Sequence, residues 1–283
     1  MKTTDLVLVL NAGSSSIKFT LFDAADAGTA GPPLLLRGQI EGLYTSPRFV
    51  AKDARGAEVG AKAWGDGVQL GHEGALDHLA EFLRGHGQGH RLAAVGHRVV
   101  HGGMDYAGAV RVTPAVVAAL AKLNPLAPLH QPHNLAPIEI LARQQPQLPQ
   151  VACFDTAFHR AQPELAQAFA LPPSITERGV RRYGFHGLSY EYIAGALPQV
   201  DPKAAAGRTI VAHLGNGSSM CALVGGRSVA STMGFTAVDG LPMGHISKGR
   251  SSASAETLAL LRHTHFTADA FPAVVRQSSQ CDL

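Results

Sequence analysis

Small residues and polar side chains occur together at two places in the chain, in a pattern that favours phosphate binding. The first segment is Asn11-Ala-Gly-Ser-Ser-Ser-Ile-Lys18, and the second is His213-Leu-Gly-Asn-Gly-Ser-Ser219. Small side chains let backbone N–H groups approach an anion closely, and glycine adopts the positive φ angles that tight loops need. Gly13-Ser14-Ser15 aligns with Gly217-Ser218-Ser219. Two such loops predict two lobes that bind one phosphate chain.

Three further side chains could take part in binding or catalysis, and Arg98 is the first of them. It lies in Gly96-His-Arg-Val-Val-His-Gly-Gly103, among apolar residues and glycines, where an unpaired guanidinium would be costly. A bidentate donor in such a pocket suits a small carboxylate or a phosphate. The alternative is a structural arginine that pairs with an internal carboxylate.

Asp155 and His186 are the other two. Asp155 follows the predicted strand 151–154, and ligands of α/β sheets bind at strand ends, although a lone aspartate is more often a turn residue or a helix cap. His186, in Arg181-Arg-Tyr-Gly-Phe-His-Gly187, can donate to charge that develops on a transferred phosphoryl group. A satisfied core histidine is the alternative. Leu126-Ala-Pro-Leu-His130-Gln-Pro-His133-Asn forms a further polar cluster beside apolar residues.

A zinc hydrolase is a weaker hypothesis. Seven histidines lie between positions 97 and 213 in these segments, and His97 and His101 have the spacing of helical ligands. Gly96, Gly102 and Gly103 make a helix there unfavourable.

The elements that must position these residues follow from periodicity and turn signals. The pattern predicts an α/β chain with one sheet in each lobe and a ligand between the lobes. Its first hairpin lacks the Gly-x-x-x-x-Gly-Lys loop and following helix of a P-loop domain. We expect strands at 6–10, 17–22, 92–95, 151–154, 210–214, 220–224 and 227–230, and helices at 75–84, from Pro114 behind a Thr113 cap, and from an Asn134 cap to about Arg143. The boundary near Asp155 divides the chain into lobes 1–154 and 155–283.

Composition indicates a folded soluble protein. The 283 residues are 46% hydrophobic and 16% charged, with a formal net charge of +3. Scattered basic residues argue against nucleic acid as a partner, and the longest early apolar run is too short to cross a membrane. Three widely spaced cysteines imply neither a disulfide framework nor a thiolate zinc site, so we expect a cytoplasmic protein.

Taken together, the motifs resemble the acetate kinase family, within the sugar kinase, Hsp70 and actin superfamily. The match covers nearly everything up to Gly244 and also includes Phe154-Asp-Thr-Ala-Phe-His159 and Met233-Gly-Phe-Thr236. The resemblance implies a two-lobed, duplicated ribonuclease H-like α/β fold. It further implies reversible transfer of the γ-phosphoryl group of ATP to acetate, giving acetyl phosphate and ADP, with Mg²⁺ or Mn²⁺ as cofactor and a homodimer as the assembly.

The resemblance also implies a role for each matching residue. Asp155 and His186 would be catalytic, and Asn11 would contact the metal. Acetate would be bound by Arg98, Val100, Leu129, His130 and Phe185, and the nucleotide by Ser14, Ser16, Lys18, His213, Leu214, Gly215, Asn216 and Gly217. A carboxylate needs little help from a base, so we expect Asp155 mainly to position Mg²⁺ or substrate.

The chain departs from the family pattern after Gly244. Ile246 stands where the family places an arginine over the transferring phosphoryl group, and Arg250 is a possible replacement within the altered segment 245–257. Family members also continue beyond position 283, so we expect an incomplete second lobe and impaired activity. The alternatives are a propionate or butyrate kinase and a non-catalytic nucleotide-binding remnant.

Overall fold

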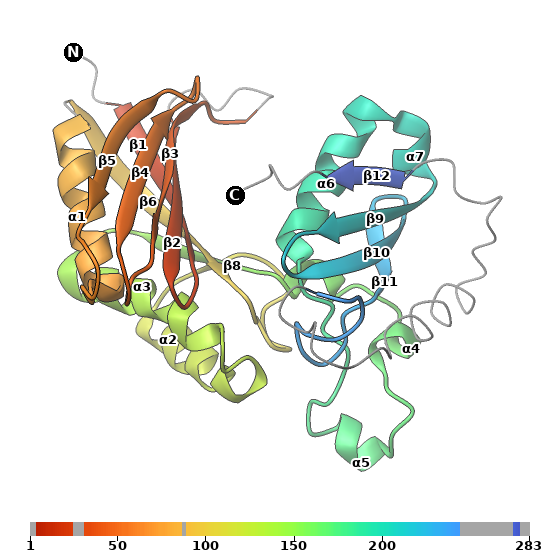
Figure 1. The fold of residues 1–283 in the computed structure, drawn as a ribbon. Coiled ribbons are helices and arrows are strands. Elements are labelled where there is room, and N and C mark those ends of the chain that lie inside the picture. The colour runs from red at the N-terminus through yellow and green to blue at the C-terminus, as the bar shows by residue number, and fades with distance from the viewer. Residues whose placement is uncertain (1–3, 25–30, 87–88, 244–273, 278–283) are drawn as a thin grey trace.

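Two β-sheets, each with its own helices, organise the chain (Figure 1). The computed structural model describes residues 4–24, 31–86, 89–243 and 274–277. The first sheet has the strand order β5-β4-β3-β2-β1-β6-β8-β7, and the second has the order β11-β10-β9-β12. The α/β class expected from the sequence is confirmed.

The first sheet is mixed. β1 to β5 form an antiparallel meander, whereas β6 and β8 run parallel to β1 and β7 pairs antiparallel with β8. Alternate residues of β1 (Leu6, Leu8, Leu10 and Ala12) are buried, as expected for a strand with one face on a core. The strand bounds are β1 Thr4–Ala12, β2 Ser16–Asp23, β3 Leu34–Glu41, β4 Arg48–Asp53, β5 Glu58–Ala63, β6 His90–Val99, β7 Val110–Arg111 and β8 Gln150–Phe154.

Three helices and a short 3₁₀ turn accompany this sheet: α1 Gly71–His86, α2 Pro114–Ala121, η1 Asn124–Leu126 and α3 Gln131–Gln144. Leu76 and Leu79 of α1 and Leu141 of α3 join the strands in one apolar core. The predicted cap of α2 is confirmed, because Thr113 accepts a hydrogen bond from the Val116 N–H. The predicted start of α3 at Asn134 is wrong: the helix begins one turn earlier, and Asn134 lies inside it.

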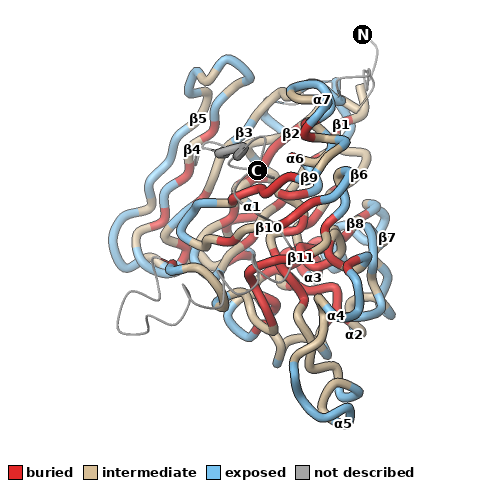
Figure 2. The backbone as a smooth tube through the Cα atoms, turned by 90° about the vertical axis from the view of Figure 1, so that its right-hand side faces the viewer, coloured by how far each residue is buried: buried red, intermediate tan, exposed pale blue. Residues whose placement is uncertain are grey.

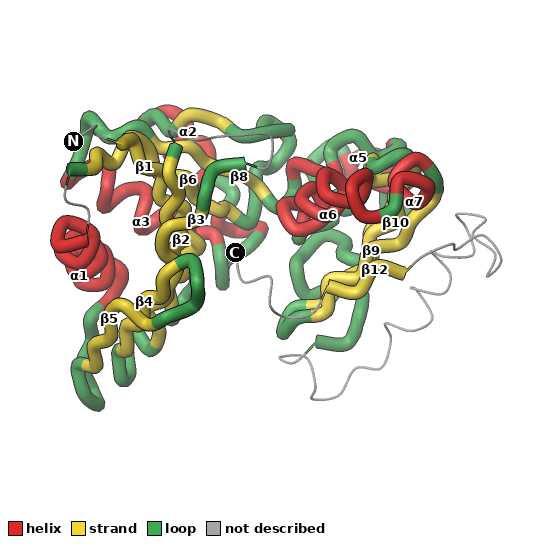
Figure 3. The backbone as a smooth tube through the Cα atoms, turned by 90° about the horizontal axis from the view of Figure 1, so that it is seen from above, coloured by secondary structure: helices red, strands yellow, loops and turns green. Residues whose placement is uncertain are grey.

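The second sheet comprises β9 Arg208–Leu214, β10 Ser218–Val224, β11 Arg227–Ser231 and β12 Val274–Gln277, the last parallel to β9. Its helices are η2 Ala157–His159, α4 Glu164–Gln167, α5 Pro173–Thr176, α6 Gly187–Val200 and α7 Pro202–Ala206. Seen from above, α6 and α7 lie along one side of β9 and β10 (Figure 3). Tyr190 and Ile193 of α6 pack against Val211, Cys221 and Leu223, and buried backbone follows β9, β10 and β11 (Figure 2).

The two small-residue loops are hairpin turns, but their predicted alignment is wrong by two positions. The first turn is Gly13–Ser15, between the end of β1 at Ala12 and the start of β2 at Ser16. The second is Gly215–Gly217, between paired Leu214 and Ser218. The first loop therefore corresponds to Gly215–Gly217, and Ser219 is a buried strand residue. Repeated glycines and serines allow either alignment in sequence, whereas the strand bounds align Gly13 with Gly215.

Candidate active site

The carboxyl ends of three neighbouring parallel strands bring together Asn11, Arg98 and Asp155. Asn11 is the penultimate residue of β1, Arg98 that of β6, and Asp155 directly follows β8. Arg98 Nη1 donates to Asn11 Oδ1 at 3.0 Å, while its Nη2 donates to Asp155 Oδ2 at 2.6 Å and its Nε to both carboxylate oxygens. Three residues predicted from separate motifs thus form one hydrogen-bonded cluster at a sheet edge that suits ligands.

The ion pair within this cluster is unequal in burial. The Asp155 side chain is 3% exposed and the Arg98 side chain 31% exposed. The charge of Asp155 raises the pKa of Arg98 and outweighs the opposing effect of burial, and the hydrogen bond between the two side chains raises that pKa further. The alternative foreseen for Arg98, pairing with an internal carboxylate, is therefore correct. It does not use the whole guanidinium, because one N–H on each of Nη1 and Nη2 remains for a ligand.

Asn134 holds the strand ends in place from α3. Its side-chain amide donates to the Ala12 carbonyl at 2.5 Å and accepts from the Val100 N–H at 2.8 Å. Gln131, one turn earlier, hydrogen-bonds both the N–H and the carbonyl of His101. Sequence reasoning missed both roles because it read Asn134 as a helix cap. The polar Gln-Pro-His-Asn run at the start of an otherwise apolar helix was the available signal.

Facing this cluster, His186 and His213 form a stacked pair. Their ring centroids are 4.2 Å apart with an interplanar angle of 28°. Burial and then the neighbouring His213 lower the pKa of His186 to about 3, and burial also lowers that of His213. Both imidazoles are therefore neutral at neutral pH.

Each imidazole directs Nε2 to the second hairpin turn. A Cβ added to Gly217 would stand 3.3 Å from His186 Nε2, and one added to Gly215 would stand 3.6 Å from His213 Nε2. The Nδ1 atoms are hydrogen-bonded to serine hydroxyls, Ser219 for His186 and Ser189 for His213. Glycine at position 217 leaves room between the imidazole and the turn. Asn216 at the apex is exposed.

Phe185 and His186 occupy a left-handed backbone conformation, with φ of 51° and 53°. Among the described residues they are the two non-glycine positions with positive φ. Such conformations cost of order 1–3 kcal/mol and persist where the surroundings enforce them. Here His159 Nε2 donates to the Phe185 carbonyl at 2.7 Å, and the Gly187 N–H donates to the Asp155 carbonyl at 2.7 Å. The strain therefore turns His186 towards Asp155 and the hairpin.

An apolar cluster lies beside these polar groups. It contains Val100 and Phe185, both predicted to line an acetate pocket, together with Ala127, Tyr183, Met233 and Met243. Leu129 is 71% exposed and lies outside that cluster, and His130 precedes the first residue of α3. The acetate-binding roles of these residues stay predictions.

The first hairpin turn is supported by α1. His72 Nε2 donates to the Gly13 carbonyl at 2.8 Å, and the Tyr44 hydroxyl bonds His72 Nδ1. Ser14 is exposed, Ser16 is half-buried, and Lys18 pairs with Asn11 across the hairpin. Ser14, Ser16 and Lys18 thus lie at or next to the first hairpin turn. Their contact with a nucleotide stays a prediction. His72 was not identified from the sequence.

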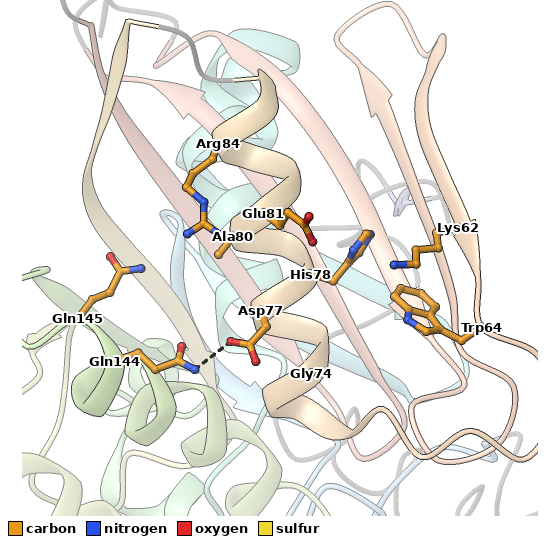
Figure 4. Close-up of a pocket in the computed structure, with 10 residues that line it drawn as sticks. All are labelled: Lys62, Trp64, Gly74, Asp77, His78, Ala80, Glu81, Arg84, Gln144 and Gln145. Carbon is orange, nitrogen blue, oxygen red and sulfur yellow. Dashed lines mark hydrogen bonds between the residues drawn. The ribbon is translucent and has the colours of Figure 1, made fainter.

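A surface cavity of about 670 Å³ lies elsewhere, along the second half of α1 (Figure 4). It is lined by Lys62, Trp64, Asp77, His78 and Arg84 among others, and Gln144 at the end of α3 donates to Asp77. None of the predicted site residues contributes to its lining. The length of α3 between Asn134 and Gln144 keeps this cavity apart from the strand-end cluster.

Within the described ranges, no group of three or more His, Cys, Asp or Glu side chains is placed to hold a metal ion. In the same residues, no helix is both long enough and apolar enough to cross a bilayer.

A model of the acetokinase family matches residues 6–277. The chain therefore belongs to the acetokinase family. It is 54% identical over 242 residues to the acetate kinase of Rhodopseudomonas palustris, an alignment that covers 85% of this chain and 60% of that protein.

Solved structures agree with this membership. A propionate kinase from Francisella tularensis superposes with a TM-score of 0.76 at 31% identity, and the acetate kinase of Porphyromonas gingivalis with a TM-score of 0.73 at 32% identity. Each alignment covers 94% of this chain and 66% of the solved one. The predicted acetokinase fold is confirmed.

The chain spans about 60% of the length of its curated relative from R. palustris. Ile246, Arg250 and the rest of segment 245–257, in which the sequence departs from the family pattern, lie outside the described residues.

Proposed function

We propose that this acetokinase transfers the γ-phosphoryl group of ATP to acetate, reversibly, giving acetyl phosphate and ADP. One observation carries the proposal: the Arg98 cluster at the ends of β1, β6 and β8 faces two neutral imidazoles whose Nε2 atoms point at the Gly215–Gly217 turn. The Arg98 guanidinium, which can bind a carboxylate, thus lies opposite a glycine-containing turn that can bind phosphates.

Arg98 is proposed to bind the acetate carboxylate with the two N–H groups that Asn11 and Asp155 leave unused. The Asp155 contacts fix the guanidinium plane, which sets the direction of approach. The carboxylate is already ionised, so the barrier is dominated by alignment and by charge on the phosphoryl group. Asp155 is then proposed to position Arg98 and the substrate, a role that its burial and its pairing with Arg98 favour.

The phosphoryl group itself is proposed to lie between Arg98 and the Gly215–Gly217 turn. His186 donates from Nε2 to its equatorial oxygens, and His213 supports it from the stacked face. Ser14, Ser16, Lys18 and the residues from His213 to Gly217 are proposed to hold the nucleotide phosphates from the two hairpins. This brings the two lobes to one ligand.

Mg²⁺ is part of the proposal, with Asn11 and Asp155 as its neighbours. Both supply oxygen donors, which Mg²⁺ prefers, and Asp155 Oδ1 accepts a single hydrogen bond from Arg98, which leaves it a further lone pair. Mg²⁺ is commonly held by one or two carboxylates together with substrate phosphates. When bound, the ion would neutralise charge on the phosphates.

Propionate is the competing substrate. A propionate kinase is among the similar solved structures, and Val100 and Phe185 belong to an apolar cluster that a longer acid would also contact. One methylene changes binding in such a pocket by only about 1–3 kcal/mol. Butyrate extends the same series, and the residues named here leave the order of preference to measurement.

A homodimer and a cytoplasmic location complete the proposal. The dimer comes from resemblance to the family. The free thiols of Cys153 and Cys221 suit a reducing compartment.

The test is formation of acyl phosphate from ATP, Mg²⁺ and each of acetate, propionate and butyrate, trapped with hydroxylamine. We expect the hydroxamate product from acetate and its loss in an Arg98→Gln variant. Nucleotide binding without product from any of the three acids would instead support the non-catalytic remnant. Impairment through the altered segment 245–257 predicts a rate below that of the R. palustris enzyme measured in parallel.

A further inference from the structure

Two buried hydroxyl groups form a hydrogen-bonded chain that ends at His186. Ser219 Oγ lies 2.8 Å from His186 Nδ1 and also hydrogen-bonds the Tyr190 hydroxyl. Ser219 and Tyr190 are both 0% exposed. No bulk water therefore competes for these hydrogen bonds.

The proton order along this chain follows from the Tyr190 end. The Tyr190 side chain is fully buried, so water cannot accept the proton of its hydroxyl. A buried hydroxyl proton without an acceptor costs free energy, and the Tyr190 proton must therefore be donated to a neighbouring protein group.

Ser219 Oγ is the acceptor that the described residues offer for the Tyr190 proton. Once Ser219 accepts from Tyr190, its single proton is free to donate to the nitrogen on its other side, His186 Nδ1. His186 Nδ1 is then an acceptor. In a neutral imidazole the remaining proton lies on Nε2.

We propose that Ser219 and Tyr190 are positioning residues that hold neutral His186 in the tautomer with its proton on Nε2. This is the nitrogen directed at Gly217, as shown by the 3.3 Å separation from an added Cβ. With the other tautomer, a lone pair would face the anion at that turn and repel it. The relay therefore decides whether His186 attracts or repels the phosphoryl group.

The charges around His186 keep it neutral. His213, Arg98 and His159 disfavour the imidazolium, Asp155 alone among these neighbours favours it, and burial outweighs all of them. A neutral imidazole has only one N–H, so the groups that surround the ring determine which of its two nitrogens carries that proton.

The tautomer is measurable without catalysis, by imidazole ¹⁵N NMR of the full chain labelled with [¹⁵N]histidine. His186→Gln assigns the signals by their disappearance. We expect the Nε2-protonated neutral pattern in the parent protein at pH 7. In Tyr190→Phe and Ser219→Ala we expect a mixture of the two neutral tautomers.

Thr209→Val is the matched control. Thr209 is 1% exposed and its hydroxyl donates to the Ala204 carbonyl, so the variant also removes a buried hydroxyl from the second lobe. The His186 signals should not change. A protonated Nδ1 in the parent protein would overturn the proposal, and so would an unchanged Nε2 tautomer in both relay variants. The parent measurement needs no variant to fold.

The catalytic consequence rests on the proposed function. If that holds, Tyr190→Phe should lower kcat about tenfold, the factor that one net hydrogen bond is worth, while the KM for acetate changes little. Thr209→Val should retain the parent kcat. An inactive parent that shows the Nε2 tautomer would contradict phosphoryl transfer and still support the relay, so the two failures are distinguishable.

Discussion

Arg98 forms an ion pair within the protein and is also the proposed binding group for the acetate carboxylate. Removing its partner would leave a part-buried cation unpaired on that side, and the same partner fixes the plane in which the unused N–H groups point. Pairing with Asp155 is thus no argument against a binding role for Arg98. It is the means by which a long side chain with several rotamers is presented in one orientation.

Asp155→Asn tests this combination. The amide oxygen can still accept one hydrogen bond from Arg98, but the charge and the bidentate contact are lost. We expect kcat to fall about 100-fold through loss of alignment, and the stability to unfolding to fall by about 1–2 kcal/mol, since Arg98 is part-exposed. Steady-state kinetics and urea unfolding measure the two effects.

Asp5→Asn is the control for that variant. Asp5 also forms a bidentate pair with an arginine, Arg91, but at the exposed amino ends of β1 and β6. It should leave kcat and the unfolding midpoint unchanged. Near-normal turnover in Asp155→Asn would contradict the positioning role of this carboxylate.

At the scale of elements, the first turn of α6 fixes the site. Its N-terminus contacts the end of β8 through the Gly187 N–H and the Asp155 carbonyl, and His159 supports the preceding strained residues. The His159 ring occupies the space beside Gly184, where a Cβ would stand 2.5 Å from it. Backbone approach, rather than side-chain packing, therefore sets the separation between His186 and Asp155.

Gly187→Ala should disturb that approach. A Cβ at this position would stand 2.2 Å from the Asp155 carbonyl oxygen, which a backbone atom cannot avoid without a shift of the helix or the strand end. We expect a loss of about 1–3 kcal/mol in unfolding free energy, together with a large fall in kcat. Denaturant unfolding and kinetics on the same preparation measure both.

Gly195→Ala in the same helix provides the comparison. Nothing lies within 4 Å of its added Cβ, so alanine should be accommodated and should stabilise the helix by about 0.5–1 kcal/mol. Equal stability of the two variants would show that the contact between α6 and β8 does not restrain the helix.

The elements with regular patterns could be predicted, and the contacts between them could not. A run of apolar residues identified β1, and proline behind a threonine cap identified α2. β3, β4 and β5 were not predicted: Gly38 and Gly60 interrupt the apolar pattern of β3 and β5, and β4 buries only Phe49 and Ala51. The cluster of Asn11, Arg98 and Asp155 was expected only as separate motifs. Its hydrogen bonds depend on strand order, as do those of Asn134, and local sequence does not encode that order.

Across the whole molecule, several buried histidines remain neutral. Burial is the main cause in each case and lowers the pKa of His97, His101 and His159 to about 4 and that of His186 to about 3. Two of these belong to segments at the end of β6, and two to the region around α6. Acid should therefore weaken both lobes, including the region that carries the proposed chemistry.

The stability should fall as the pH is lowered from 7 to 5. The unfolded chain protonates its histidines near pH 6.5, whereas the folded chain does so only near pH 3–4, so in this window the unfolded state binds more protons. Unfolding free energy then rises with pH, by roughly 1 kcal/mol per pH unit for each such histidine near pH 5.5. Four together contribute about 4 kcal/mol per unit, a large part of the usual margin of about 5–15 kcal/mol.

Urea unfolding between pH 7.5 and 5 measures this slope, and His97→Gln calibrates it. His97 Nε2 donates to Gln150 Oε1 at 2.7 Å, and a glutamine amide offers a donor that does not titrate. The slope should decrease by about a quarter, because one of four groups no longer takes up a proton on unfolding. A flat profile between pH 6.5 and 5 would mean that these histidines are charged in the folded chain. In that case His186 could not present the single N–H of a neutral ring to the phosphoryl group.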